Sequence, residues 1–263
     1  MNHSGIHPAG PTPPLVAVAH GTTDPAGAAA IRTLIRQVGL LRPGLDVTAA
    51  FLSNGTPSLD DALSASAVAG RAPVVVPLLL SSGYHVRHDI PRIVSARRGP
   101  HDSIAITPHL GPDPLVINIL ADHVELKLGA RLLSASRVVL AAAGSRDPLA
   151  ARETAAAAAL LSRRLGSPVR PAYVTTTEPP LDEALEHAAR EARGDRVIVA
   201  TYLLATGEFE RRIHAAAANV AGVDIRVTDP LAPDARLARL VLERYDASVP
   251  SRLRPAAELL PAA

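Results

Sequence analysis

The sequence contains no cysteine and no tryptophan, and aromatic residues make up only 2% of it. Without cysteine, neither disulfides nor thiolate metal sites can form. The scarcity of aromatic rings argues against a stacking platform for single-stranded nucleic acid. A formal net charge of +2 gives no reason to expect a polyanionic partner. We therefore expect no nucleic-acid partner.

Long apolar runs are also missing, because no stretch reaches the 18 residues or so that a membrane span requires. Residues 1–13 are polar and contain three prolines, which is not the pattern of a secretory leader. These features predict a soluble, cytoplasmic protein with no membrane partner. The sequence also has no Gly-x-Gly-x-x-Gly, P-loop or Gly-x-Ser-x-Gly motif. Nucleotide and α/β-hydrolase chemistry therefore have no support, and we expect no organic cofactor.

What the chain does contain is a regular alternation of short apolar runs with helical patterns. Strands are expected over 15–19, 45–52, 72–80, 103–107, 137–142, 169–175, 196–203 and 223–228. Helices are expected over 57–69, 148–165, 180–193, 208–220 and 234–246, with further helical patterns at 31–41 and 116–124 and one ending near Arg98. Such alternation predicts an α/β fold with parallel strands and helices on both faces.

The alternation is also an internal repeat. HGTTDP (20–25) matches AGSRDP (143–148), and PLLLSSG (77–83) matches TYLLATG (201–207). Two further pairs of segments match in the same order, at offsets of 121 and 122 residues. We expect two similar open parallel-sheet half-domains with flavodoxin-like layers, facing a central cleft. The first half is assigned to 14–133 and the second half to 134–248, with flexible tails at 1–13 and 249–263. Two halves in one chain are compatible with a monomer.

The two halves differ in their histidines. His20 follows the first expected strand and His85 follows the third, whereas Ala143 and Phe209 stand at the matching positions of the second half. In open parallel sheets, ligands bind beyond the carboxyl ends of the strands. Two imidazoles at that edge can hold a divalent first-row metal or act as bases near neutral pH. The sequence therefore predicts a site in the first half built on His20 and His85.

Three other residues in these segments are Ala19, Asp24 and His109. AHGTT is similar to the Arg-His-Gly of histidine phosphatases, but Ala19 occupies the position of the arginine that would bind phosphate. Asp24 precedes a proline at the expected start of a helix, which is typical of an N-cap rather than of a catalytic acid. His109 follows the fourth strand, where it either faces the cleft or lies on a surface loop.

VAVAHGTTDP (16–25), PSLDDAL (57–63), VPLLLSSGYHVRHDIPRIV (76–94) and HLGPDPLV (109–116) resemble the sirohydrochlorin chelatase family of the SirB and CbiX type. The resemblance covers roughly residues 15–245. It implies a class II chelatase fold and insertion of Fe²⁺ into sirohydrochlorin, with Co²⁺ as the nearest alternative. It assigns the metal-binding and catalytic roles to His20 and His85. The metal is then a substrate, and the tetrapyrrole is the small-molecule partner.

The resemblance also suggests how the substrate is bound, and it has one gap. Sirohydrochlorin carries many carboxylates, so we expect basic groups and backbone N–H groups along the cleft. The expected substrate-binding residues are Gly21, Ser81, Ser82, Gly83, Tyr84 and Arg87. Family members usually have an acid after the second strand, where this chain has Ser53. That difference leaves open a non-catalytic tetrapyrrole or metal carrier derived from the enzyme.

Overall fold

The computed structural model describes residues 12–97, 104–129, 136–192 and 195–249. Its strands form two four-stranded parallel sheets with the same order. The first sheet is ordered β2-β1-β3-β4 and contains β1 (Leu15–Ala19), β2 (Val47–Phe51), β3 (Val74–Pro77) and β4 (Ala105–Ile106). The second is ordered β6-β5-β7-β8 and contains β5 (Arg137–Ala142), β6 (Val169–Tyr173), β7 (Arg196–Tyr202) and β8 (Asp224–Val227). The predicted α/β fold with two repeated parallel sheets is confirmed.

Helices cover both faces of each sheet. They are α1 (Pro25–Leu41), α2 (Leu59–Val68), α3 (Ile90–Ala96), α4 (Pro114–Leu128), α5 (Pro148–Leu165), α6 (Leu181–Ala192), α7 (Glu208–Asn219) and α8 (Ala235–Ser248). A π-helical turn, η1 (His85–Asp89), precedes α3. Asp24, Asp113 and Asp147 each cap a helix by accepting a hydrogen bond from a backbone N–H of its first turn. The N-cap prediction for Asp24 is thus confirmed.

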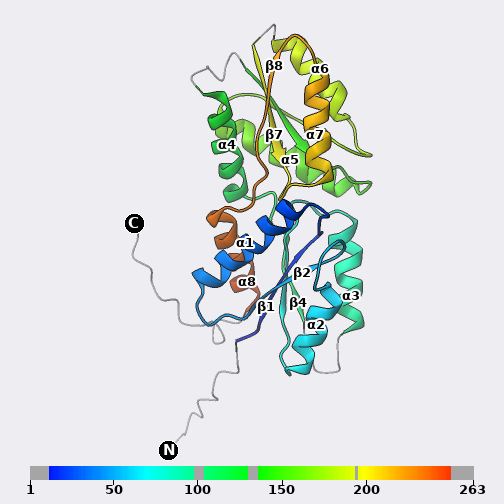
Figure 1. The fold of residues 1–263 in the computed structure, drawn as a ribbon, viewed down its shortest axis with the longest axis vertical. Coiled ribbons are helices and arrows are strands. Elements are labelled where there is room, and N and C mark those ends of the chain that lie inside the picture. Colours follow the sequence, from blue (N-terminus) through cyan, green and yellow to red (C-terminus); the bar gives the residue numbers. More distant parts are fainter. Residues whose placement is uncertain (1–11, 98–103, 130–135, 193–194, 250–263) are drawn as a thin grey trace, which may run out of the picture.

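The two halves exchange their last helices. Helix α8 packs against α1 and β3 of the first half, whereas α4 packs against α5 and β7 of the second half (Figure 1). As a result, one apolar cluster contains buried residues of both halves, such as Leu34, Val116, Leu161 and Leu240. The outer face of each sheet has a separate cluster of its own. Each predicted half-domain therefore supplies one sheet and covers the other sheet with its last helix.

Most of the two predicted terminal tails lies outside the residues that the structure describes. Of the tails predicted at 1–13 and 249–263, only Thr12, Pro13 and Val249 belong to the described residues. The Tyr245 hydroxyl donates a hydrogen bond to the Pro13 carbonyl at 2.5 Å, which ties the start of the described chain to α8. Within the described ranges, none of the helices combines the length and the apolar character needed to cross a membrane.

Candidate active site

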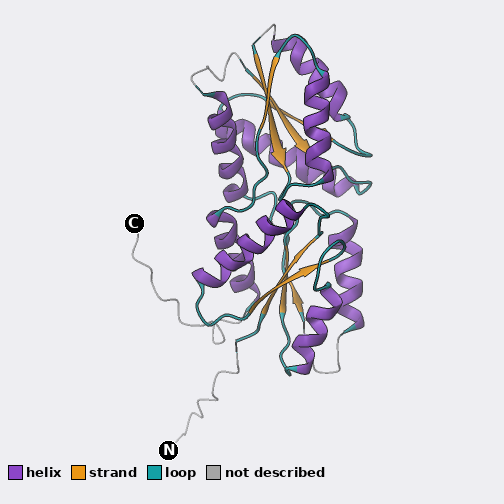
Figure 2. Cartoon of the chain, in the orientation of Figure 1, coloured by secondary structure: helices purple, strands orange, loops and turns teal. Residues whose placement is uncertain are grey.

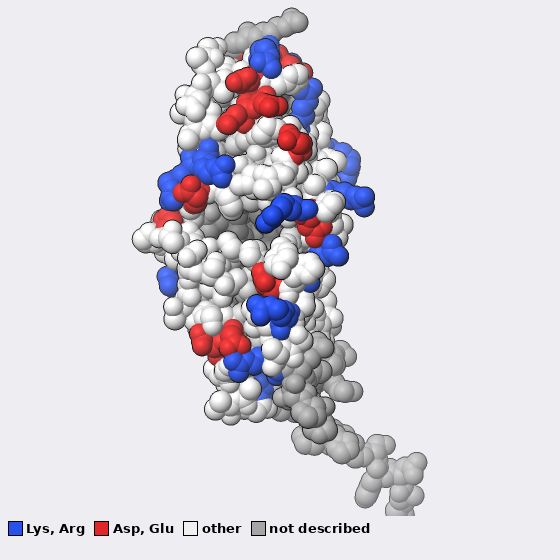
Figure 3. Space-filling view, turned by 90° about the vertical axis from the view of Figure 1, so that its right-hand side faces the viewer, with Lys and Arg blue, Asp and Glu red and all other residues white. Residues whose placement is uncertain are grey.

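The carboxyl ends of both sheets point toward the middle of the molecule, as the strand arrows in Figure 2 show. A cavity of about 510 Å³ lies there, which is within the size range of small-molecule sites. Its walls come from the segments that follow β1 and β3 in the first half, and β5 and β7 in the second. From the side, a hollow is visible across the middle of the molecule (Figure 3). The cavity is therefore a cleft shared by the two halves.

His20 and His85 meet in this cleft. His20 directly follows β1, and His85 is the first residue of η1, so parallel pairing of β1 with β3 brings the two side chains to one edge. Their ring centroids are 4.6 Å apart, with an angle of 36° between the ring planes. Both residues line the cavity. The two imidazoles that the sequence singled out are thus neighbours, although 65 positions separate them in the chain.

The surroundings of the two rings leave one nitrogen atom of each ring available to bind a cation. The Nδ1 atom of His85 is 2.6 Å from Oδ2 of Asp89, so the carboxylate orients the ring and leaves Nε2 for a ligand. The Nδ1 atom of His20 is buried and has no hydrogen-bond partner in the described structure. Burial lowers the pKa of His20, with a further lowering by the charge of His85, while Asp89 acts in the opposite direction. His20 is therefore held neutral near pH 7.

A bound cation would explain the unpaired nitrogen, since buried polar atoms in proteins nearly always have a partner. Two imidazoles also leave several positions around a metal ion open. Among the residues that the structure describes, no group of three or more histidine, aspartate or glutamate side chains is placed to hold a metal ion. The histidine pair is accordingly the candidate metal-binding site.

The opposite wall of the cleft has a similar backbone but different side chains. Ala143 and Phe209 line the cavity at the positions that match His20 and His85. The position that matches Asp89 is Ile213, which is fully buried. Gly144 has φ +91°, close to the +98° of its counterpart Gly21. The second half therefore lacks both imidazoles and the carboxylate that orients one of them, on an unchanged loop geometry.

Ser53, at the position where the resemblance implies an acid, contacts the backbone of the first strand's end. Its N–H donates to the His20 carbonyl at 2.9 Å, and its hydroxyl donates to the same oxygen at 3.1 Å. Thr175 makes the matching contacts with the Ala143 carbonyl in the second half, at 3.0 and 2.8 Å. The serine thus belongs to the shared scaffold that fixes the end of β1, and its exposed side chain does not line the cavity.

The predicted substrate-binding residues divide into two groups. Gly21, Ser81, Gly83 and Tyr84 line the cavity, whereas Ser82 and Arg87 do not. The N–H of Ser82 donates to Glu153 Oε2 at 2.5 Å, and the N–H of Gly83 donates to the Ser81 carbonyl at 2.9 Å. Both N–H groups already have an acceptor within the chain, and their binding of substrate carboxylates stays a prediction.

Arg87 is bound across the cleft instead of pointing into it. Its guanidinium pairs with Asp147, the N-cap of α5, at 3.0 Å. The matching residues of the other half, Arg211 and Asp24, approach each other to 4.0 Å. Because both copies of the repeat make this contact, it is a symmetric tie between the halves. The role of Arg87 as a substrate contact stays a prediction.

The basic lining that we expected is also missing. None of the described residues that line the cavity is lysine or arginine, and its carboxylates are Glu208 and Glu210. Basic side chains lie on the outer surface beside the hollow (Figure 3). His109 neither lines the cavity nor lies on an open loop, because its side chain is 15% exposed with Nε2 3.1 Å from Glu153 Oε2. It contacts the second half.

Sequence reasoning missed three residues near the site. Asp89 lies four positions after His85 in a helical segment, a spacing that signals a contact and was available in the sequence. Glu153 and Tyr202 reach the loop before His85 from the other half. No local sequence pattern predicts either contact, since each partner is more than 70 positions away.

Comparisons with known proteins agree with the motifs. The CbiX family model matches residues 14–126 and 137–248. The sirohydrochlorin ferrochelatases of Priestia megaterium and Bacillus subtilis are 29% and 30% identical to the chain, over 60% and 62% of it. The matches cover only 60% and 64% of those relatives. A sirohydrochlorin cobaltochelatase of Methanosarcina acetivorans is 25% identical over 42% of this chain and 93% of its own length.

Solved structures support the same fold. The structure of SirB from Bacillus subtilis with Fe³⁺ has a TM-score of 0.74, with 22% identity, and covers 89% of this chain and 94% of that one. A structure of CbiX, described as the terminal enzyme of sirohaem biosynthesis in denitrifying bacteria, has a TM-score of 0.67 and covers 90% and 100%. The family model matches the repeat in both halves of the sequence. The chain therefore belongs to the CbiX family.

Proposed function

We propose that this protein is a metal chelatase that inserts Fe²⁺ into sirohydrochlorin, with His20 and His85 as metal-binding and catalytic residues. The observation that carries the proposal is the imidazole pair, 4.6 Å apart, in a cleft whose opposite wall lacks both rings. The curated relatives that match the longest segments are named ferrochelatases, which favours iron over cobalt.

Holding the metal is the first task of the site. Fe²⁺ has to exchange its water for imidazole nitrogen and then for the four nitrogens of the macrocycle. Burial favours neutral His20, and only a neutral imidazole offers a lone pair to the metal. Asp89 fixes the orientation of His85 through Nδ1, so that Nε2 is presented to the cleft. Two ligands hold the ion without filling its coordination sphere, which leaves positions for the ring nitrogens.

Removing protons from the macrocycle is the second task. Two pyrrole N–H protons leave as the metal enters, and a neutral imidazole is a suitable acceptor near pH 7. His20 and His85 can each accept one of them once the ion has passed from the imidazoles to the ring, and the lowered pKa of His20 keeps that residue unprotonated before the reaction. The cavity wall contributes an apolar surface, including Ile31, Phe51, Leu78 and Phe209, against which a macrocycle can rest. The carboxylates of the substrate would then extend toward the basic surface beside the hollow.

The test is an anaerobic insertion assay with sirohydrochlorin and either Fe²⁺ or Co²⁺, run side by side. We expect insertion faster than the uncatalysed rate, with His20→Ala and His85→Ala each slower by about 100-fold or more. His187→Ala is the matched control, because this histidine lies on α6 and pairs with Glu191 away from the cleft. Wild-type rates in both cleft variants would overturn the site assignment.

The same assay separates the alternatives. A carrier would bind sirohydrochlorin or the metal ion without exceeding the uncatalysed insertion rate. A cobaltochelatase would be faster with Co²⁺ than with Fe²⁺, and that result would replace iron in the proposal while leaving the two histidines in place.

A further inference from the structure

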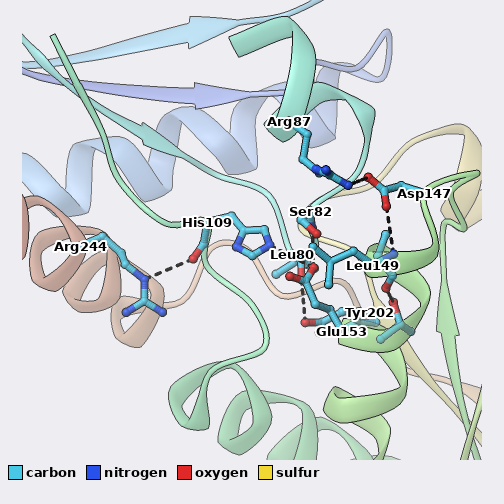
Figure 4. Close-up of polar contacts among 11 residues, drawn as sticks. Leu80, Ser82, Arg87, His109, Asp147, Leu149, Glu153, Tyr202 and Arg244 are labelled. Carbon is cyan, nitrogen blue, oxygen red and sulfur yellow. Dashed lines mark hydrogen bonds and ion pairs between the residues drawn. The ribbon is translucent and has the colours of Figure 1, made fainter. Parts of the chain in front are cut away.

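The loop that leads to His85 is held by side chains of the second half. The hydroxyl of Tyr202 donates to the Leu80 carbonyl at 3.0 Å, and Glu153 Oε2 accepts the N–H of Ser82 at 2.5 Å. Figure 4 shows Glu153 and Tyr202 beside Leu80 and Ser82. Both contacts are made by the five residues that precede His85, the first residue of η1.

These contacts exist on one side of the repeat only. The counterpart of Glu153 in the first half is Ala30, and the counterpart of Tyr202 is Leu78; neither side chain can form the matching hydrogen bond. The loop without a histidine is instead contacted at Thr206, whose carbonyl accepts from Thr22 Oγ1 at 3.3 Å. By contrast, the contact of Arg87 with Asp147 recurs in both copies.

A glycine makes room for the tyrosine contact. A Cβ atom on Gly111 would lie 2.3 Å from Tyr202 Oη and 2.6 Å from the Leu80 carbonyl. The matching position of the second half is Ala232, and there the counterpart of Tyr202 is Leu78, which has no hydroxyl. Gly111, Tyr202 and the Leu80 carbonyl therefore form one fitted contact that the other copy lacks.

The surroundings of Glu153 keep its carboxylate in place. The side chain is 19% exposed, and the same Oε2 that accepts from Ser82 is 3.1 Å from His109 Nε2. A carboxylate in such a position requires partners, and hydrogen bonds to a charged acceptor are stronger than neutral ones. Tyr202 is almost fully buried, which keeps it a protonated donor. Both groups are thus fixed donors or acceptors rather than mobile surface side chains.

We propose that Glu153 and Tyr202 are positioning residues through which the second half fixes the loop that carries His85 for metal insertion. The inference rests on the proposed function, because it assigns these residues to the same site. A displacement of His85 by about 1 Å would be enough to slow a reaction that depends on placed ligands. The half without imidazoles would thereby contribute to the reaction through its contacts with the other half.

The experiment compares Glu153→Leu, Glu153→Gln and Tyr202→Phe in the full chain. The leucine variant loses the acceptor for Ser82, whereas glutamine keeps an oxygen that can accept it. Glu125→Leu is the matched control, since Glu125 pairs with Arg164 between α4 and α5, away from the loop. The measurements are kcat and KM for insertion at 25 °C, Co²⁺ affinity by titration calorimetry, and Tm.

We expect Glu153→Leu and Tyr202→Phe to lower kcat by about tenfold or more, with KM for sirohydrochlorin within about twofold of wild type. Both should also weaken Co²⁺ binding, and Glu153→Gln should recover most of the rate. The phenylalanine variant keeps the volume of the ring, so it tests the inference even if the leucine variant fails to fold. A purely structural role would lower Tm and leave kcat and Co²⁺ affinity unchanged, which would overturn the inference.

The two proposals fail differently. If the wild-type chain neither binds Co²⁺ through His20 and His85 nor inserts metal, the proposed function is wrong. If the wild-type chain does both and the Glu153 and Tyr202 variants match it, only the positioning role is wrong.

Discussion

Replacing Gly21 with alanine tests how closely the segment after β1 approaches the segment after β2, next to His20. Gly21 has φ +98°, and a Cβ atom there would lie 1.6 Å from the Ser53 carbonyl oxygen. A left-handed backbone costs a residue with a side chain about 1–2 kcal/mol. Moving the Ser53 peptide away also weakens its hydrogen bond to the His20 carbonyl, at a further cost of about 1 kcal/mol. We therefore expect Gly21→Ala to lose about 2–3 kcal/mol in total.

Two glycines serve as controls for this change. Gly44 has φ +83°, but no atom lies within 4 Å of the place that a Cβ would take, so Gly44→Ala should cost only the backbone part, about 1–2 kcal/mol. Gly144 has φ +91° with the Thr175 carbonyl 2.1 Å from the Cβ position, so Gly144→Ala should lose about as much stability as Gly21→Ala. It leaves His20 in place, however, and should keep more of the insertion activity.

The assay is urea unfolding followed by circular dichroism, together with Tm. At about 2–4 °C per kcal/mol for a chain of this size, Gly21→Ala should melt about 4–12 °C below wild type. Insertion rates would be measured at a temperature at which all three variants are folded. The reasoning would be refuted if Gly21→Ala were no less stable than Gly44→Ala, because the close approach to Ser53 would then contribute nothing.

Two further predictions concern protonation and the ties across the cleft. The pKa of folded His20 is below its ordinary value, so the unfolded chain takes up this proton first as pH falls below about 6.5. The free energy of unfolding should therefore decrease between pH 7.5 and 5.5, and His20→Gln should lose less of it; equal losses would contradict the assigned environment of His20. Arg87→Ala and Arg211→Ala should each lower Tm slightly and leave KM for sirohydrochlorin unchanged, as expected of exposed ion pairs. A rise in KM for Arg87→Ala alone would show that this residue is a substrate contact.

Much of the local structure could be predicted because it depends on short-range chemistry. The expected strand 137–142 and helix 148–165 have the bounds that the structure shows. The N-cap at Asp24 follows from an aspartate before a proline. The proximity of His20 and His85 follows from the parallel alternation, because both histidines come after strands that pair in one sheet.

What could not be predicted depends on partners that are distant in the sequence. The exchange of α4 and α8 is hidden because an amphipathic pattern shows that a helix is buried on one side, not which sheet it covers. The N–H of Ser82 looks available in the sequence, but its acceptor Glu153 is 71 positions away. Arg87 looks like a cleft residue, but its partner Asp147 is 60 positions away. Both partners belong to the other half of the chain.

The exchange of helices explains why the second half is needed even without histidines. Leu237, Leu240, Val241 and Tyr245 of α8 are fully buried, and α8 packs on α1 and β3 of the first half. Burying one such side chain contributes about 1.5–3 kcal/mol, and a whole domain is stable by only about 5–15 kcal/mol. The first sheet therefore depends on α8, a helix that follows all the strands of the second sheet in the sequence. With the two halves bound together in this way, a carboxylate or hydroxyl of the second half can hold the His85 loop at a fixed distance. The second half would then act on the site through these contacts, although it carries no imidazoles of its own there.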